Sequence, residues 1–139
     1  MTALRVYATT VAIGGRGVMI VGPSGSGKSD LALRLIDRGA VLVSDDYTEC
    51  LAHDGAVTAS SPGTIAGRME VRGVGIVDMP HAPKVPVALV VTLGEAVERM
   101  PEPYPKRVAG IDIPAIALAA FEASTPIKVE IALARLVGG

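Results

Sequence analysis

Residues 22–29 read GPSGSGKS and follow the apolar run at residues 17–21 (GVMIV) directly. The octapeptide fits the pattern G-x-x-x-x-G-K-[ST] of a phosphate-binding loop at every fixed position. Residues 28–38 (KSDLALRLIDR) continue it with apolar side chains at helical spacing. An apolar strand, a glycine-rich loop and an amphipathic helix therefore occur in the required order. We predict a P-loop at the centre of an α/β domain.

The glycines of such a loop let backbone N–H groups converge on nucleotide phosphates, and the positive end of the following helix adds to the attraction. In this interpretation Lys28 reaches the β- and γ-phosphates of ATP, and the Ser29 hydroxyl is a ligand of Mg²⁺. The alternative, a flexible turn that contains a lysine by chance, does not explain why strand, loop and helix agree. The predicted nucleotide-binding residues are Gly22, Pro23, Ser24, Gly25, Ser26, Gly27, Lys28 and Ser29.

The rest of the chain reads as short strands between Gly- and Pro-rich turns. Periodicity and the Gly and Pro positions predict strands at residues 4–13, 40–45 and 86–93 and a hairpin at 48–59. In the segment at 73–79 the glycines suggest that the backbone approaches some other group closely. Residues 100–106 read as a loop. Helices are predicted at 114–121 and 126–137, the second with Thr125 as its N-cap.

Length and composition favour one domain spanning residues 1–139 with an aliphatic core. The net charge is −1 with both signs scattered, so no basic field for nucleic acid or anionic lipid is evident. The single cysteine, Cys50, excludes an internal disulfide and suits a reducing compartment. No stretch approaches the ~20 apolar residues of a membrane span, and no signal peptide is recognisable. We expect a soluble cytoplasmic protein without nucleic-acid or membrane partners.

Carboxylates that could serve phosphoryl transfer stand at strand ends or beside glycines: Asp45, Asp46, Glu70 and Asp78. Such a site needs them to hold Mg²⁺ and to orient the nucleophile. If Asp45 and Asp46 both stay extended, they point to opposite faces and cannot share one role. A solvated pair that caps a turn is the alternative. Asp78 competes with them for the metal, and spacing does not decide between the three.

The motifs GPSGSGKS, LVSDD (residues 42–46) and EVRGVGIVD (residues 70–78) together resemble the HPr kinase/phosphorylase family. The likeness is to the catalytic domain alone, in the short form associated with alphaproteobacteria, and covers about residues 5–135. It implies a P-loop core with a mixed sheet, related to phosphoenolpyruvate carboxykinase. It also implies ATP-dependent phosphorylation of a serine on the phosphocarrier HPr, often with reversal by phosphorolysis, and a homo-oligomer, by resemblance a hexamer.

The resemblance assigns a role to each matched residue. Lys28 matches the catalytic P-loop lysine and Ser29 a Mg²⁺ ligand. Asp46 matches the residue proposed to accept the proton of the substrate serine, and Asp45 takes a supporting or metal-side role. A carboxylate of ordinary pKa, near ~4, is ionised at neutral pH and can accept a hydroxyl proton.

Further matches to the family lie after Asp45 and Asp46 in the sequence. Glu70 matches the second Mg²⁺ ligand, with Arg72 and Asp78 in the signature around it. Arg99 is the best match to a further catalytic arginine, and this alignment rests on the apolar strand before it. Two ligands of Mg²⁺, a lysine and an arginine would neutralise the charge on the transferred phosphoryl group.

The sequence departs from the family pattern at two places. Tyr7 stands fifteen residues before Gly22, where the family carries a catalytic histidine. With a pKa near ~10, a tyrosine exchanges protons poorly at neutral pH, and a packing role is the alternative. After residues 126–129 (PIKV), Glu130 and Ile131 replace the Gly-Arg-Asn continuation that bears on dephosphorylation. Two other functions stay open, a P-loop kinase for a small molecule and a nucleotide-sensing module with little turnover.

Overall fold

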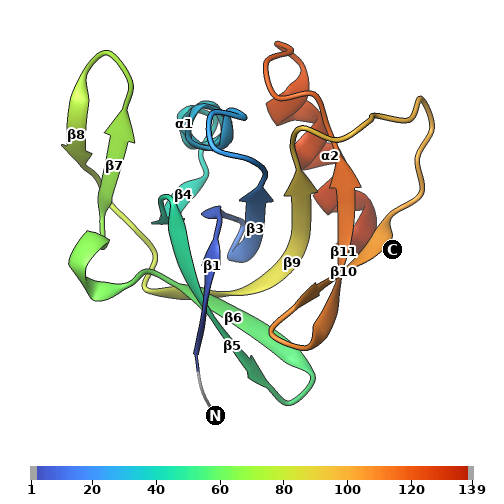
Figure 1. The fold of residues 1–139 in the computed structure, drawn as a ribbon, viewed down its shortest axis with the longest axis horizontal. Helices are drawn as coiled ribbons and strands as arrows, with labels where there is room; N and C mark the ends of the chain where they lie inside the picture. Colours follow the sequence, from blue (N-terminus) through green and yellow to red (C-terminus); the bar gives the residue numbers. More distant parts are fainter. Residues whose placement is uncertain (1–2, 138–139) are drawn as a thin grey trace.

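A curled, mixed β-sheet forms the centre of the computed structural model, which describes residues 3–137 (Figure 1). Its strands are β1 (Leu4–Tyr7), β2 (Thr9–Ile13), β3 (Arg16–Val21), β4 (Val41–Ser44), β5 (Tyr47–His53), β6 (Ala56–Ser60), β9 (Lys84–Thr92), β10 (Tyr104–Val108) and β11 (Ile111–Ala117). The order is β1-β5-β6-β9-β3-β2-β4, and β11 joins β9 to β10. Strand β9 runs parallel to β3 and β11, and the other pairings in the sheet are antiparallel.

Two helices and one separate hairpin complete the described chain. The helices are α1 (Lys28–Asp37) and α2 (Thr125–Val137), with a short 3₁₀ turn, η1 (Gly63–Ile65). Strands β7 (Arg68–Val71) and β8 (Gly75–Asp78) pair only with each other, and Figure 1 shows their hairpin standing apart from the main sheet. Neither described helix is long and apolar enough to cross a membrane.

The core is aliphatic, as the composition predicts, and lies on both faces of the sheet. One cluster packs Leu31 and Leu35 of α1 and Leu133 of α2 against strand residues. A second cluster comes almost entirely from strands and includes Met19 and Cys50. Strand β3 is therefore buried on both sides, which explains its unbroken apolar sequence.

The parallel strands decide where a ligand can bind. Because β3, β9 and β11 run in the same direction, their carboxyl ends lie together, and the segments that follow them begin there. This edge of the sheet is formed by strand ends and not by an outer strand. These segments are the P-loop, residues 93–103 and residues 118–124. Open α/β sheets bind ligands at the carboxyl ends of their strands, so this edge is where a nucleotide is expected.

Most predicted elements are confirmed, among them α1, β3, β4, β9, α2 and the β5–β6 hairpin. The single strand predicted at residues 4–13 is wrong, because the chain divides at Ala8. There β1 pairs with β5, whereas β2 pairs with β3 and β4. The loop predicted at 100–106 is correct up to Pro103, after which β10 begins.

The helix predicted at residues 114–121 is also wrong, since residues 111–117 form β11. Its backbone pairs with β9 and β10, and Ala115 is fully buried there. Sheet pairing and burial override the helix preference of alanine. At α2 the Thr125 hydroxyl donates to the carbonyl of Ala119 instead of capping the helix.

The glycines of residues 73–79 do not mark a close approach to another segment. A Cβ atom at Gly73 or Gly75 would meet nothing within 4 Å. These glycines are required because the β7–β8 turn takes them to positive φ, 88° and 124°.

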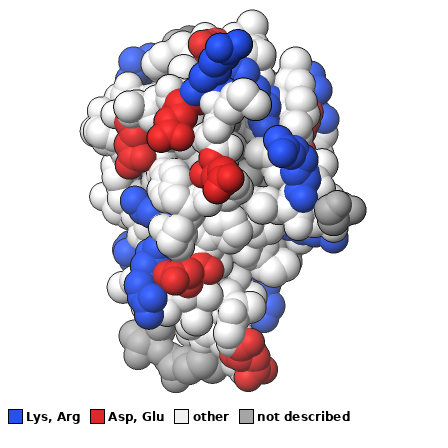
Figure 2. Space-filling view, turned by 90° about the vertical axis from the view of Figure 1, so that its right-hand side faces the viewer, with Lys and Arg blue, Asp and Glu red and all other residues white. Residues whose placement is uncertain are grey.

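On the face drawn in Figure 2, acidic and basic side chains are interspersed.

Candidate active site

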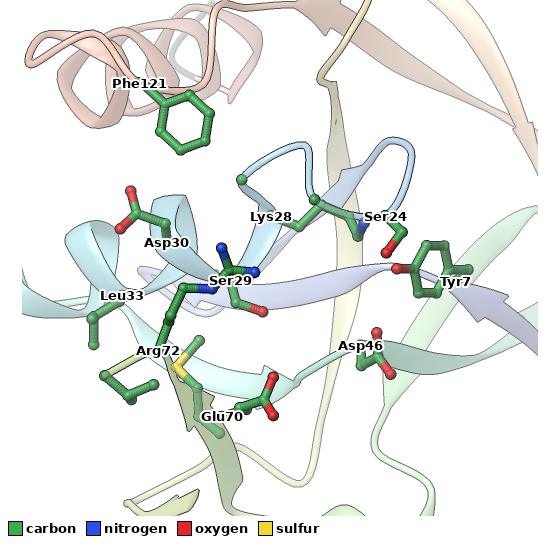
Figure 3. Close-up of a pocket in the computed structure, with 14 residues that line it drawn as sticks. Tyr7, Ser24, Lys28, Ser29, Asp30, Leu33, Asp46, Glu70, Arg72 and Phe121 are labelled. Atoms are coloured by element: carbon green, nitrogen blue, oxygen red, sulfur yellow. The ribbon is translucent and has the colours of Figure 1, made fainter. Parts of the chain in front are cut away.

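A cavity of about 340 Å³ opens beside the P-loop at the carboxyl edge of β3 (Figure 3). Its walls come from the P-loop, the start of α1, the bend after β4, the β7–β8 hairpin and the turn before α2. Tyr7 of β1 adds an aromatic ring. This volume lies in the range of small-ligand sites. Segments from the whole length of the chain therefore form one concave site.

The P-loop holds its lysine in a folded-back position. Lys28 is buried, and its Nζ donates to the carbonyl oxygens of Gly22 and Pro23, both at 3.0 Å. The same Nζ lies 4.1 Å from the centroid of the Tyr7 ring, which in turn packs on Tyr47 with 5.4 Å between centroids. An ammonium group over an aromatic face is attracted by the ring quadrupole. Tyr7 therefore packs against the P-loop lysine and lines the cavity as well.

Asp45 is the point at which four parts of the site are tied together. Its Oδ1 accepts hydrogen bonds from Ser29 Oγ at 2.6 Å and from Thr9 Oγ1 at 3.2 Å. Its Oδ2 accepts the backbone N–H of Glu70 at 3.1 Å. The Ser29 hydroxyl donates its hydrogen bond to Asp45, and the lone pairs of the Ser29 oxygen therefore stay available to a cation. These contacts fit the supporting or metal-side role predicted for Asp45.

Asp46 lies next to Asp45 but is exposed and lines the cavity. The chain leaves β4 at Ser44, and Asp46 has a φ of 71°, so the extended geometry expected for both aspartates does not occur. Its N–H donates to Thr9 Oγ1 at 3.2 Å, and its carbonyl accepts the N–H of Ala8 at 3.0 Å. The two carboxylates differ in surroundings because of this bend, and strand alternation is not the cause.

The β7–β8 hairpin contributes two charged side chains to the cavity. Glu70 ends close to the space that Ser29 and Asp46 also face, and the Arg72 side chain enters from the turn between the strands (Figure 3). Magnesium is bound in proteins by one or two carboxylates together with phosphate oxygens and water. Ser29 and Glu70, the predicted ligands, both line this cavity, and their side chains carry oxygen atoms, the kind of ligand that Mg²⁺ takes.

Two predicted participants lie elsewhere. Arg99 is exposed in the segment after β9 and does not line the cavity, whereas Arg72 does. Asp78 is also outside, with 88% of its side chain exposed and Arg68 Nε 3.6 Å away. Asp78 therefore lies outside the cavity in which the metal is expected.

The sequence alone assigned no role to three residues of the site. Thr9 joins both aspartates, Arg72 lines the cavity whereas Arg99 does not, and Phe121 lines it from the turn before α2. Two signals were present in the sequence. Arg72 lies inside the EVRGVGIVD signature, and Phe121 is the single phenylalanine of the chain.

Comparisons with known proteins identify the family and the fold of the chain. The model of the HPr Serine kinase C-terminal domain family matches residues 2–85. The HPr kinase/phosphorylase of Clostridium botulinum (strain Eklund 17B / Type B) is 44% identical over 75 residues, 54% of this chain and 25% of that protein. The one from Clostridium tetani is 45% identical over 76 residues, 55% of this chain and 25% of that protein. The chain spans about a quarter of the length of these relatives.

Sequence likeness is thus concentrated in the first part of the chain, whereas structural likeness extends further. The structure of the Hpr(Ser) kinase/phosphatase from Coxiella burnetii superposes with a TM-score of 0.81 at 27% identity, covering 95% of this chain and 88% of that one. The α/β fold with a mixed, curled sheet is therefore that of this kinase. By its sequence match over residues 2–85 and by its fold, the chain belongs to the HPr Serine kinase C-terminal domain family.

Proposed function

We propose that this chain is an ATP-dependent protein kinase that phosphorylates a serine of the phosphocarrier HPr in the cytoplasm. The observation that carries the proposal is the convergence of the P-loop, Asp46 and Glu70 on one cavity that is open to solvent. An exposed carboxylate beside the phosphate site can meet a hydroxyl presented by another protein. The family membership supplies the class of acceptor.

In the proposed reaction the serine oxygen attacks the γ-phosphorus of ATP, the bond to the β–γ bridging oxygen breaks, and ADP leaves. The Asp46 carboxylate accepts the serine proton. Thr9 and Ala8 hold the Asp46 backbone in its left-handed conformation, which aims the side chain at the cavity. Lys28 turns from the loop carbonyls to the phosphates, and Arg72 adds positive charge from the hairpin.

Ser29 and Glu70 would hold Mg²⁺, which when bound shields the charge of the β- and γ-phosphates. Asp45 fixes the two ligands relative to each other, because it accepts hydrogen bonds from the Ser29 hydroxyl and from the backbone N–H of Glu70. Any role of Arg99 requires that its segment move toward the cavity, and we assign the charge-neutralising role to Arg72.

Two further properties follow, one from the resemblance and one from a departure from the family motif. We infer a homo-oligomer, which light scattering tests. We also infer weak phosphorolysis, because Glu130 is engaged in an ion pair with Arg38 at 2.8 Å that joins α2 to the end of α1. In that place the family motif continues as Gly-Arg-Asn.

The test is incubation of the protein with ATP, Mg²⁺ and purified HPr, followed by mass spectrometry of HPr with and without excess phosphate. We expect one phosphoserine on HPr and little loss of it when phosphate is added. Tight ATP binding without any phosphoserine would contradict the proposal.

A nucleotide-sensing module is the second candidate, and the observation that favours it is Tyr7 at the histidine position. If the chain is a nucleotide-sensing module, it binds ATP but does not phosphorylate HPr, and Tyr7→His does not make it transfer phosphate to HPr. If the chain is a kinase, the wild-type protein transfers phosphate to HPr, and Tyr7→His alters only the rate of this transfer.

A further inference from the structure

We propose that Phe121 is the platform on which the base of the nucleotide stacks, and that it is therefore a binding residue of the site. The inference rests on the proposed function, because it concerns how the same cavity binds ATP. Its starting point is the shape of the cavity, which has an aromatic side chain at each end. Tyr7 and Asp46 lie at one end and Phe121 at the other (Figure 3).

Lys28 and Asp46 together indicate which end of the cavity receives the base. In a P-loop this lysine binds the β- and γ-phosphates. Its Nζ is 4.1 Å from the Tyr7 ring centroid, and Asp46 lines the same end. The transferred phosphoryl group therefore lies toward Tyr7. A nucleoside triphosphate carries its base at the opposite end of the phosphate chain, so the base extends toward Phe121.

Phe121 is placed to meet a flat ligand. The residue is 70% exposed although it carries a large apolar group. One edge of the ring rests on Gly27, where an added Cβ would come within 2.8 Å of the phenyl Cζ. Gly27 has a φ of 102° and leaves room for this contact. The ring is thus in direct contact with the last glycine of the phosphate loop.

The backbone on either side of the ring is anchored. The Arg34 guanidinium of α1 donates to the carbonyls of Ala120 and Glu122, and its Nε pairs with Asp30 at 2.9 Å. The Thr125 hydroxyl holds the carbonyl of Ala119. An exposed ring on a fixed backbone loses little conformational entropy when a ligand stacks on it. Stacking of a base on an aromatic side chain is tolerant of base identity and accounts for a substantial part of affinity.

The experiment compares two ligands that differ in the base. ATP and inorganic tripolyphosphate, each with Mg²⁺, are titrated by calorimetry into the unchanged protein and into Phe121→Ala. We expect Phe121→Ala to weaken ATP binding by about 10-fold and tripolyphosphate binding by less than about 2-fold. Met100→Ala is the matched control, because Met100 is 86% exposed on the same edge of the sheet but does not line the cavity. It should change neither affinity.

A direct readout of contact is available because the chain has no tryptophan. In Phe121→Trp, ATP should quench the indole fluorescence and tripolyphosphate should not. Equal losses for both ligands in Phe121→Ala, or equal responses in Phe121→Trp, would overturn the stacking role and leave the P-loop function standing. If the unchanged protein binds neither ligand, the proposed function fails and the stacking role fails with it. If Phe121→Ala weakens neither ligand, the ring serves another contact, such as a protein partner, and the proposal is wrong.

Discussion

The hydroxyl of Ser29 donates to Oδ1 of Asp45 at 2.6 Å, which joins the first turn of α1 to the bend after β4. Oδ1 also accepts from Thr9 in β2, and Oδ2 accepts from the backbone of Glu70 in β7. One buried carboxylate therefore holds the P-loop helix, the main sheet and the separate hairpin in a fixed relation. The geometry of the site depends on this residue even where Asp45 touches no substrate.

Asp45→Ala is expected to destabilise the fold. It leaves three hydrogen-bond donors without their acceptor, and each unsatisfied buried donor costs about 1–3 kcal/mol. Because the two hydroxyls can turn to other partners, we expect a total loss of roughly 2–4 kcal/mol in the free energy of unfolding. Urea denaturation measures it. Asp46→Asn is the control, because it changes an exposed neighbour whose left-handed backbone asparagine tolerates, and it should cost less than about 1 kcal/mol. Equal losses in the two variants would contradict the bracing role.

Asp46→Asn is expected to abolish transfer to HPr while ATP affinity stays within about 3-fold, since loss of a general base removes about 10²–10⁴ of rate. Asparagine tolerates the left-handed conformation that Asp46 occupies, so the backbone should not change. Rates come from phosphoserine formation and affinities from calorimetry. A normal transfer rate in Asp46→Asn would show that another group takes the proton.

Lys28→Ala should act on binding instead. Its ammonium group can make charge-assisted bonds to phosphate oxygens, which contribute about 1.5–3 kcal/mol. We expect ATP to bind at least about 10-fold more weakly, measured by calorimetry. Lys84→Ala is the control, since Lys84 begins β9 away from the cavity. Unchanged ATP affinity in Lys28→Ala would contradict the P-loop assignment.

Prediction from sequence succeeded where the signal was local. The P-loop and α1 follow one another in the chain, so a strand, a glycine-rich loop and a helical period define them without distant information. The roles of Asp45 and Asp46 depend on a bend at the end of β4, and alternation along an assumed strand gave the wrong reason for their difference. The bend is stabilised by Thr9, 36 residues from Asp45 along the chain, which no local pattern reveals.

The same limit explains β11 and the misplaced arginine. Residues 111–117 form a strand because β9 and β10 offer partners, and an alanine-rich segment alone does not show this. Arg99 followed a correctly predicted strand, yet its segment leads away from the cavity. Arg72 reaches the cavity because the β7–β8 hairpin is tied to Asp45 through the Glu70 backbone. Such long-range contacts decide which of several plausible charges is part of the site.

Tyr7→Leu is expected to lower the free energy of unfolding by roughly 1–2 kcal/mol, because it removes the face that holds Lys28 and the ring that packs on Tyr47. Tyr7→Phe keeps both contacts and should stay within about 0.5 kcal/mol. Urea denaturation of these variants with and without Lys28→Met forms a double-mutant cycle. The pairing of ring and ammonium predicts that Tyr7→Leu costs less once Lys28 is gone. Equal costs in both backgrounds would show that the ring stabilises the fold through Tyr47 alone.

Cys50 gives a prediction on pH that is independent of the site. It is fully buried in the strand cluster, and burial raises the pKa of its thiol to about 11. At pH 8 the native protein should therefore react slowly with iodoacetamide, and the urea-unfolded chain should react quickly. At pH 7 and below the thiol is protonated in almost all molecules of both states and adds little pH dependence. Between pH 9 and 11 the unfolded chain loses the proton that the native protein keeps, so stability falls as the pH rises.

The comparison with Cys50→Ala isolates this effect. Other groups that titrate above pH 9 contribute to the slope in both proteins, so the difference between their urea midpoints removes that contribution. The midpoint of the unchanged protein should decline more steeply from pH 9 to 10.5 than that of Cys50→Ala. Parallel declines, or rapid alkylation of the native protein at pH 8, would mean that Cys50 is accessible through opening of β5, and that this strand is less firmly held than its burial implies.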